Sequence, residues 1–271
     1  MTFTPEQLDR YSRNIMLPEV GEQGQRTLLD GSVVIVGAGG LGSPAALYLA
    51  GVGVGTIGLV DDDVVALNNL QRQVVHSTET IGTAKVASAA RRLHGLNPDI
   101  AVRTHEARLS ARNAAGIIGD YDFVIEATDS LESKCLVSEA CVSTGKPHCH
   151  GGVVGLEGQA LTVLPGRTAC YRCVFPELPP PGALPRASET GVLGPVPGVI
   201  GTVQAAEAIK FLLGIGELLE NRLLIYDSLR TRFRHVAVKP DTDCPLCSGC
   251  RIAAQTSDEQ RSRRSKKGHD R

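Results

Sequence analysis

The stretch SVVIVGAGGLGSP, residues 32–44, limits the possible folds of this chain more than any other feature. Its apolar start has the length and the unbroken hydrophobicity of a strand buried in a parallel sheet. Gly37, Gly39 and Gly42 follow with G-x-G-x-x-G spacing, and an Ala- and Leu-rich segment then predicts a helix. Such a loop brings backbone N–H groups and a helix N-terminus to an anion. Glycines required only for packing are the alternative, and the phosphate could belong to a nicotinamide dinucleotide, a flavin or ATP.

Strand and helix patterns alternate through the first half of the chain. We expect helices in the first thirty residues, strands at 32–36, 56–61, 100–105 and 121–128, and helices at 82–95 and 131–144. This alternation predicts an α/β fold with a doubly wound, Rossmann-like, mainly parallel sheet and right-handed crossovers.

The second half of the chain has a different pattern. GQALTVLP, RLLIYDS and RFRHVAVK indicate strands that continue the sheet in an antiparallel manner. The proline-rich stretch 175–198 predicts an extended crossover loop, and GTVQAAEAIKFLLG predicts a helix after it. Because no linker is evident, we expect a single domain over residues 1–250.

Composition and charge narrow the class of protein. Apolar residues make up 42% and charged residues 21% of the 271 residues, as in ordinary globular proteins. We see no apolar run that predicts a membrane span and no signal peptide, so we expect a cytoplasmic protein. The segment 251–271 is basic and we expect it to be disordered; an acidic partner or nucleic acid is the alternative. The rest of the chain is acidic, which argues against nucleic acid.

Polar residues after the second and fourth strands indicate which phosphate is bound. Asp61 ends the second strand, where a carboxylate can accept hydrogen bonds from ribose hydroxyls, as in an NAD site. A triphosphate under attack also needs fixed cationic and amide donors, which hydride transfer does not. Residues of this kind are Asn69, Arg72, Gln73 and Lys85. Asp63 lies in the same segment, and Asp129 is a possible Mg²⁺ ligand.

Each of these residues also has a plain structural interpretation. Arg13 could be an exposed side chain on the first helix, and Lys85 could solvate a helix face. Asp129 could cap the following helix, because Asp is a favoured N-cap residue. Asp62 is interpreted as a surface acid.

The cysteines suggest a metal site. Cys170 with Cys173 and Cys244 with Cys247 form two Cys-x-x-Cys pairs, which together could hold structural Zn²⁺ in a tetrahedron of thiolates. Redox-active pairs or buried thiols are the alternatives, and Cys250 could compete as a ligand. HCH at 148–150 lies at the end of an expected strand, where adjacent side chains point to opposite faces. We therefore expect it to pack in the protein and not to bind metal.

Several separated motifs together resemble the ThiF/MoeB/HesA family, bacterial relatives of the ubiquitin-activating enzymes. The resemblance runs from about residue 5 to residue 248. The motifs are RYSRN, GAGGLGS, VDDD…LNNLQRQ, AKV, EATDS, CYRC, GVLGPVPGVIGTVQAAEAIK and CPLC.

The resemblance implies roles for individual residues. Asp61 would bind the ATP ribose, Asp129 would bind Mg²⁺, and Arg13 would reach the partner subunit's ATP site in a homodimer. Asn69, Arg72 and Lys85 would contact the phosphates. Further nucleotide contacts are expected from Gly37, Gly39, Gly40, Gly42, Asp63, Asn68, Gln71, Gln73 and Ser130.

The implied reaction is the adenylylation of a carboxylate. By resemblance, the substrate is the C-terminal glycine of a small ubiquitin-like sulfur carrier ending in Gly-Gly, of the ThiS or MoaD type. The products would be carrier acyl-AMP and pyrophosphate, with sulfur transfer following. The pathway served, thiamin, molybdopterin or another, stays open.

The chain departs from the family in two places. Some members carry a crossover-loop cysteine where this chain has Ala187, and the neighbouring Ser188 is a weaker nucleophile than a thiolate. We therefore expect the enzyme to stop at the acyl-adenylate, with a separate sulfur donor. Ser130 stands where the family usually has Asn. Activation of another carboxylate or a modified tRNA base, an NAD-dependent oxidoreductase, and a docking scaffold are the alternatives.

Overall fold

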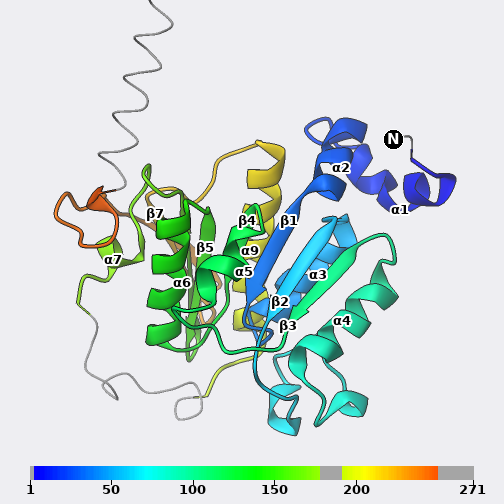
Figure 1. The fold of residues 1–271 in the computed structure, drawn as a ribbon, viewed down its shortest axis with the longest axis horizontal. Helices are drawn as coiled ribbons and strands as arrows, with labels where there is room; N and C mark the ends of the chain where they lie inside the picture. Colours follow the sequence, from blue (N-terminus) through cyan, green and yellow to red (C-terminus); the bar gives the residue numbers. More distant parts are fainter. Residues whose placement is uncertain (1–2, 178–190, 250–271) are drawn as a thin grey trace, which may run out of the picture.

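All eight described strands belong to one twisted sheet with helices on both faces (Figure 1). The computed structural model describes residues 3–177 and 191–249. The strands are β1 (Ser32–Val36), β2 (Thr56–Val60), β3 (Ala101–His105), β4 (Phe123–Glu126), β5 (His148–Val154), β6 (Glu157–Val163), β7 (Arg222–Asp227) and β8 (Arg232–Ala237). The helices are α1 (Pro5–Ile15), α2 (Gly21–Asp30), α3 (Gly42–Val52), α4 (Lys85–Leu96), α5 (Ala114–Gly119), α6 (Leu131–Thr144), α7 (Tyr171–Val174) and α9 (Pro195–Leu213), with 3-10 turns at Leu67–Asn69 and Thr78–Thr80.

The order of strands confirms the expected fold class. The sheet runs β3-β2-β1-β4-β5-β6-β7-β8. The pairs from β3 to β5 are parallel, and those from β5 to β8 are antiparallel. The order reverses between β1 and β4, where an open parallel sheet forms a crevice at the carboxyl ends of its strands.

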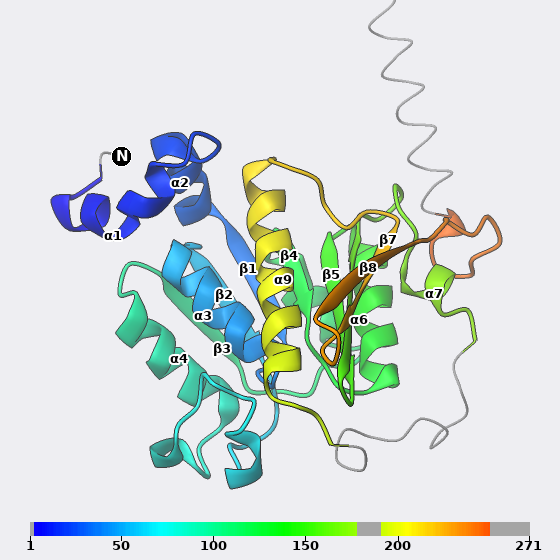
Figure 2. The same ribbon diagram turned by 180° about the vertical axis from the view of Figure 1, so that it is seen from behind.

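Two apolar layers hold the sheet between its helices. Val33 and Ile35 of β1 face α3, α4 and α9, whereas Val34 and Val36 face α5 and α6. Figure 2 shows α9 running across the sheet beside α3, on the face opposite α6. Strands β1, β2 and β4 are thus covered on both faces, which explains their mainly apolar sequences, whereas the edge strand β3 is mostly exposed and carries polar residues.

Local sequence signals mark the start of α1 and the ends of α3, α6 and α9. Thr4 and Gln7 form a capping box at the start of α1. Gly53, Gly145 and Gly214 take left-handed conformations directly after α3, α6 and α9.

Some expected boundaries were wrong. HCH begins β5 and does not end a strand; within it His148 and His150 share one face, as residues two apart do. Helix α9 begins at Pro195, six residues earlier than expected, because Pro is accepted in a first helical turn. The first thirty residues form the two helices α1 and α2, whereas the short helices α5 and α7 were not expected.

Helix α9 is the one described helix that is long and apolar enough to cross a membrane. It packs against α3 and against strands β4, β5 and β6, and its apolar residues such as Val196, Ile200 and Ala208 belong to the core. Length and composition alone therefore do not indicate a span here.

Candidate nucleotide-binding site

A cleft of about 360 Å³ lies at the carboxyl ends of β1, β2 and β4. The glycine loop after β1, the segments after β2 and β3, and the turn after β4 line it. The expected site residues that line it are Gly37, Gly39, Gly40, Asp61, Asp63, Arg72, Gln73, Lys85, Asp129 and Ser130. Residues far apart in sequence thus meet at the crevice where the strand order reverses.

The glycine loop is packed against its neighbours more closely than side chains would allow. Gly37 has φ of +102°, and a Cβ there would lie 2.6 Å from the Ala127 carbonyl oxygen. A Cβ on Gly42 would lie 1.9 Å from the Gly37 carbonyl oxygen. At Gly39 the nearest atom is the Gln73 side-chain nitrogen, at 3.6 Å. Gly37 and Gly42 therefore shape the turn, while Gly39 leaves backbone facing the cleft.

Asp61 connects the glycine loop to the segment after β2. Its carboxylate accepts hydrogen bonds from Ala38 N at 2.7 Å and from Asp63 N at 2.9 Å. Burial raises the pKa of Asp61, and the nearby Lys85 ammonium opposes this shift. The carboxylate is held at the cleft wall, where it can accept hydrogen bonds from a sugar.

Lys85 lies at the first position of α4 and is almost completely buried. Its ammonium donates to Asp63 Oδ2 at 2.8 Å, although the Asp63 side chain is 71% exposed. The Asp63 carboxylate, which lines the cleft, thus holds the place beside Lys85 that another anion could take. Lys85 is not a solvated surface lysine, contrary to the plain structural interpretation.

The 3-10 turn after β2 contributes fewer cleft residues than expected. Arg72 and Gln73 line the cleft, whereas Asn68, Asn69 and Gln71 do not. Asn69 Oδ1 accepts from Ala66 N at 3.2 Å, and the Asn69 amide donates to Asn68 Oδ1. Gln71 donates to the Val192 carbonyl. The side-chain amides of Asn69 and Gln71 thus hold the turn in place. Arg72 also donates to a backbone carbonyl of this turn, that of Asn68, at 3.1 Å.

The turn after β4 places Asp129 and Ser130 at the cleft. Ser130 is the N-cap of α6, since its hydroxyl accepts from Ser133 N at 3.1 Å. Asp129 therefore does not cap this helix, and the plain interpretation of Asp129 was wrong. Asp62 also lines the cleft and is exposed.

Arg13 lies away from this cleft. It is exposed on α1, where its guanidinium contacts the Met16 sulfur. Helix α1 packs through Tyr11, which reaches Asn97 and Asp99 just before β3 begins. Helix α1 lies at the amino ends of the strands (Figure 1), and Arg13 is not among the residues that line the cleft of its own chain.

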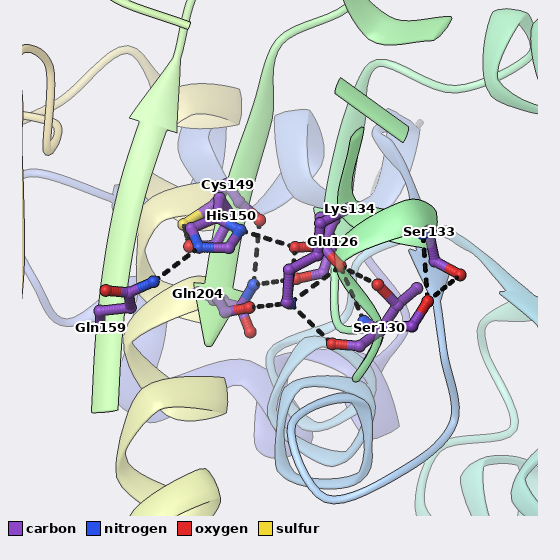
Figure 3. A network of polar contacts seen from close by, with 10 residues as sticks. Glu126, Ser130, Ser133, Lys134, Cys149, His150, Gln159 and Gln204 are labelled. Atoms are coloured by element: carbon purple, nitrogen blue, oxygen red, sulfur yellow. Dashed lines mark hydrogen bonds and ion pairs between the residues drawn. The ribbon is translucent and has the colours of Figure 1, made fainter. Parts of the chain in front are cut away.

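A buried polar network beneath the cleft was missed by sequence reasoning (Figure 3). Lys134 lines the cleft and contacts both carboxylate oxygens of Glu126, at 3.1 and 3.3 Å. His150 Nδ1 lies 2.7 Å from Glu126 Oε2. Burial by itself would raise the pKa of Glu126, but Lys134 and the hydrogen bonds from His150 and Thr128 lower it to about 2. An acid within the apolar run YDFVIEAT was the available signal, because a buried charge requires a partner.

Other lining residues had no sequence signal of their own. Arg108 and Leu109 come from the segment after β3, and Val192 and Pro197 come from the start of α9 and the residues before it. They reach the cleft only because the sheet brings these segments together.

The four paired cysteines come together at α7 and the segment after β8. Their sulfurs lie 3.7 Å apart for Cys170 and Cys173, 3.6 Å for Cys170 and Cys244, and 3.4 Å for Cys173 and Cys247. Sulfurs about 2.3 Å from a central Zn²⁺ would be separated by about 3.8 Å in a tetrahedron. The arrangement is compatible with zinc. Ala187, Ser188, Cys250 and the segment 251–271 lie outside the described residues.

The fold and the cleft together define a Rossmann-like α/β protein whose cleft gathers cationic side chains and carboxylates around a glycine loop. The model of the ThiF family matches residues 11–246, and the chain belongs to this family. The match spans the cleft and three of the four cysteines, and it ends one residue before Cys247.

Similar curated proteins carry the names of adenylyltransferases and activating enzymes. The chain is 49% identical over 247 residues to the SAMP-activating enzyme E1 of Haloferax volcanii, covering 91% of each. It is 45% identical over 252 residues to the sulfur carrier protein adenylyltransferase of Thermus thermophilus, covering 91% of this chain and 93% of that protein. The adenylyltransferase and sulfurtransferase MOCS3 of Arabidopsis thaliana is 45% identical, but the match covers 53% of its length. The chain is thus an enzyme of the adenylyltransferase class.

Solved structures of MccB from E. coli share the fold. The complex with ATP is 25% identical with a TM-score of 0.77, and the match covers 88% of this chain and 74% of that one. The complex with SeMet MccA has a TM-score of 0.79 at 25% identity, covering 91% and 75%.

Proposed function

We propose that this enzyme uses ATP to adenylylate the C-terminal glycine of a small ubiquitin-like sulfur-carrier protein ending in Gly-Gly. The observation that carries this proposal is the cleft that gathers the glycine loop, Asp61, Arg72, Lys85 and Asp129. The names of the relatives from Haloferax and Thermus support the same substrate class.

The cleft residues suit an in-line attack on the α-phosphate. A carboxylate oxygen of the carrier would form the new bond to phosphorus, while the bond to the bridging oxygen breaks and pyrophosphate leaves. Asp61 would hold the ribose, and Arg72 and Lys85 would meet the growing negative charge on the phosphates. Lys85 would exchange the Asp63 carboxylate for phosphate oxygens. Asp129 would hold Mg²⁺, which neutralises phosphate charge when bound.

We propose that the active unit is a homodimer in which Arg13 serves the partner's cleft. The position of α1 at the amino ends of the strands supports this, because Arg13 is remote from its own cleft. A cationic side chain contributed by a second copy would complete the phosphate site.

Two further parts of the proposal concern metal and sulfur. Cys170, Cys173, Cys244 and Cys247 would hold a structural Zn²⁺ that joins α7 to the segment after β8. The sequence has no cysteine between Cys173 and Cys244, so the enzyme would release acyl-adenylate to a separate sulfur donor. We place the reaction in the cytoplasm, with residues 1–250 acting as one domain.

ATP–pyrophosphate exchange tests the proposal directly. Purified protein is incubated with sulfur carriers ending in Gly-Gly, and exchange is expected only when a carrier is present. Lys85→Ala and Arg13→Ala should each lower the exchange rate by about 10²- to 10³-fold, the loss typical of a donor to transition-state charge. Absence of exchange with every carrier would contradict the sulfur-carrier assignment. Exchange that continues in the Lys85 variant would contradict the role of the cleft.

A further inference from the structure

Lys134 connects three segments of the chain at the floor of the cleft (Figure 3). Besides the Glu126 carboxylate, its ammonium donates to the carbonyl oxygens of Thr128 at 2.7 Å and Gly151 at 2.6 Å. These acceptors lie in β4, in the turn after β4 and in β5. The Lys134 side chain is 9% exposed. Its three N–H groups are directed at protein acceptors, so it is poorly suited to bind a phosphate directly.

Thr128 is held on all its polar groups. Its N–H donates to Glu126 Oε1 at 2.8 Å, its hydroxyl donates to the same oxygen at 2.5 Å, and its carbonyl accepts from Lys134. The next residue but one, Ser130, is fixed as the N-cap of α6. Asp129 therefore lies between two residues whose positions are determined by hydrogen bonds.

The opposite side of the sheet fixes Glu126 as well. The Gln204 amide of α9 donates to the Glu126 carbonyl at 2.7 Å and to the Cys149 carbonyl at 2.9 Å. His150 holds the carboxylate from β5. The end of β4 is thus attached to helices on both faces of the sheet and to the neighbouring strand.

A gain in stability alone does not explain the buried ion pair of Glu126 and Lys134. Removing an acid and an amine from water is costly, and well-packed apolar side chains often stabilise a core as much or more. A buried pair next to an expected cation ligand suggests that precise placement is what the pair provides.

We propose that Lys134 is a positioning residue, which with Glu126 fixes the turn after β4 so that the Asp129 carboxylate can hold a divalent cation with ATP. This inference rests on the role of Asp129 in the proposed function. Lys134 acts through Thr128 and not by contact with the nucleotide.

The experiment measures ATP affinity by calorimetry without any carrier, with Mg²⁺ and with EDTA. Mg²⁺ should tighten ATP binding to the wild type. In Lys134→Met this enhancement should fall by about 10- to 100-fold, the usual effect of losing a residue that orients a metal ligand. Lys134→Arg keeps the charge and several donors and should restore most of it. Lys146→Met is the matched control, because Lys146 also donates to a backbone carbonyl, that of Tyr121, but away from the cleft.

Two double variants keep the test decisive. Glu126→Gln with Lys134→Met removes both buried charges, so it tests the donor's role even if Lys134→Met alone unfolds. This double variant should also lose the Mg²⁺ enhancement while thermal unfolding remains cooperative. Asp129→Asn with Lys134→Met should bind ATP with Mg²⁺ no more weakly than Asp129→Asn alone.

Distinct results would overturn the inference. An enhancement that persists in Lys134→Met, or that falls equally in Lys146→Met, would contradict it, as would additive losses from the Asp129 and Lys134 substitutions. Failure of the proposed function appears separately, as carrier-independent or absent pyrophosphate exchange in the wild type. Absent Mg²⁺ enhancement in the wild type would contradict the cation role of Asp129 and this inference with it.

Discussion

At the scale of single residues, burial decides which charged groups could be found from sequence. Asp61, Arg72, Lys85 and Asp129 follow strands or begin a helix, where polar side chains are expected near a crevice. Glu126 is inside a strand, and its partner Lys134 is eight residues away on a helix. Their pairing depends on how α6 packs against β4, which the local pattern does not specify.

His148 provides a prediction about pH and stability. Its ring nitrogens make no well-formed hydrogen bond among the described residues, and burial lowers its pKa to about 4, a shift that the Glu126 carboxylate and the Lys146 backbone only partly oppose. An unfolded histidine has a pKa of about 6.5. The unfolded chain therefore binds a proton that the folded chain excludes, and stability falls as the pH drops from about 6.5 to about 4, by up to about 3 kcal/mol.

His148→Leu should reduce this loss, because the apolar side chain binds no proton. Denaturant unfolding at pH 7 and pH 5 measures the difference. At pH 7 the variant should be about as stable as the wild type, since no well-formed hydrogen bond is lost. His94→Leu, on the exposed face of α4, is the control. An unchanged pH dependence in His148→Leu would contradict the explanation.

At the scale of elements, the glycine loop depends on close backbone contact. Gly42→Ala would place a methyl group 1.9 Å from the Gly37 carbonyl oxygen, and that oxygen belongs to backbone that has little room to move. We expect a loss of about 3 kcal/mol or more in the free energy of unfolding, together with weaker ATP binding.

Gly51→Ala is the matched control for this substitution. It lies in the same helix, α3, and a Cβ there would meet no atom within 4 Å. Alanine favours a helix over glycine by about 1 kcal/mol, so this variant should be slightly more stable than the wild type. Urea unfolding measures both, and equal effects of the two substitutions would contradict the packing argument.

At the scale of the whole molecule, we expect one Zn²⁺ per chain at the four cysteines. Removal by a chelator, or Cys247→Ser, should lower the free energy of unfolding by at least about 2 kcal/mol, because the metal joins distant segments. Metal analysis and thermal unfolding measure this. Cys135→Ala, at a cysteine outside the cluster, should leave the zinc content unchanged. A purified protein without metal would contradict the assignment.

Mixing two inactive variants tests the shared site of a dimer. Arg13→Ala should disable the partner's cleft, whereas Lys85→Ala should disable the cleft of its own chain. A mixed dimer therefore contains one site in which both residues are intact. After subunit exchange about half of the dimers are mixed, and exchange activity should recover to about a quarter of the wild-type value. No recovery despite demonstrated subunit mixing would place Arg13 outside the partner's cleft.

The sequence by itself determined the strands and long helices, the parallel core and the glycine loop. These depend on local periodicity and on residues adjacent in the chain, such as the loop glycines after β1. The motifs EATDS and AKV also indicated Asp129 and Lys85 as site residues. Each motif stands next to an apolar strand or a helical pattern that can be recognised from neighbouring residues alone.

Only the tertiary structure decided which side chains meet. It placed Asn69 and Gln71 in bracing contacts outside the cleft, put Arg13 at the opposite end of the sheet, and joined Glu126 to Lys134 and His150. Contacts of this kind depend on strand order and helix packing, which bring together residues far apart in sequence. Their energies come from burial and hydrogen bonding in the folded state, and those are set by the whole fold.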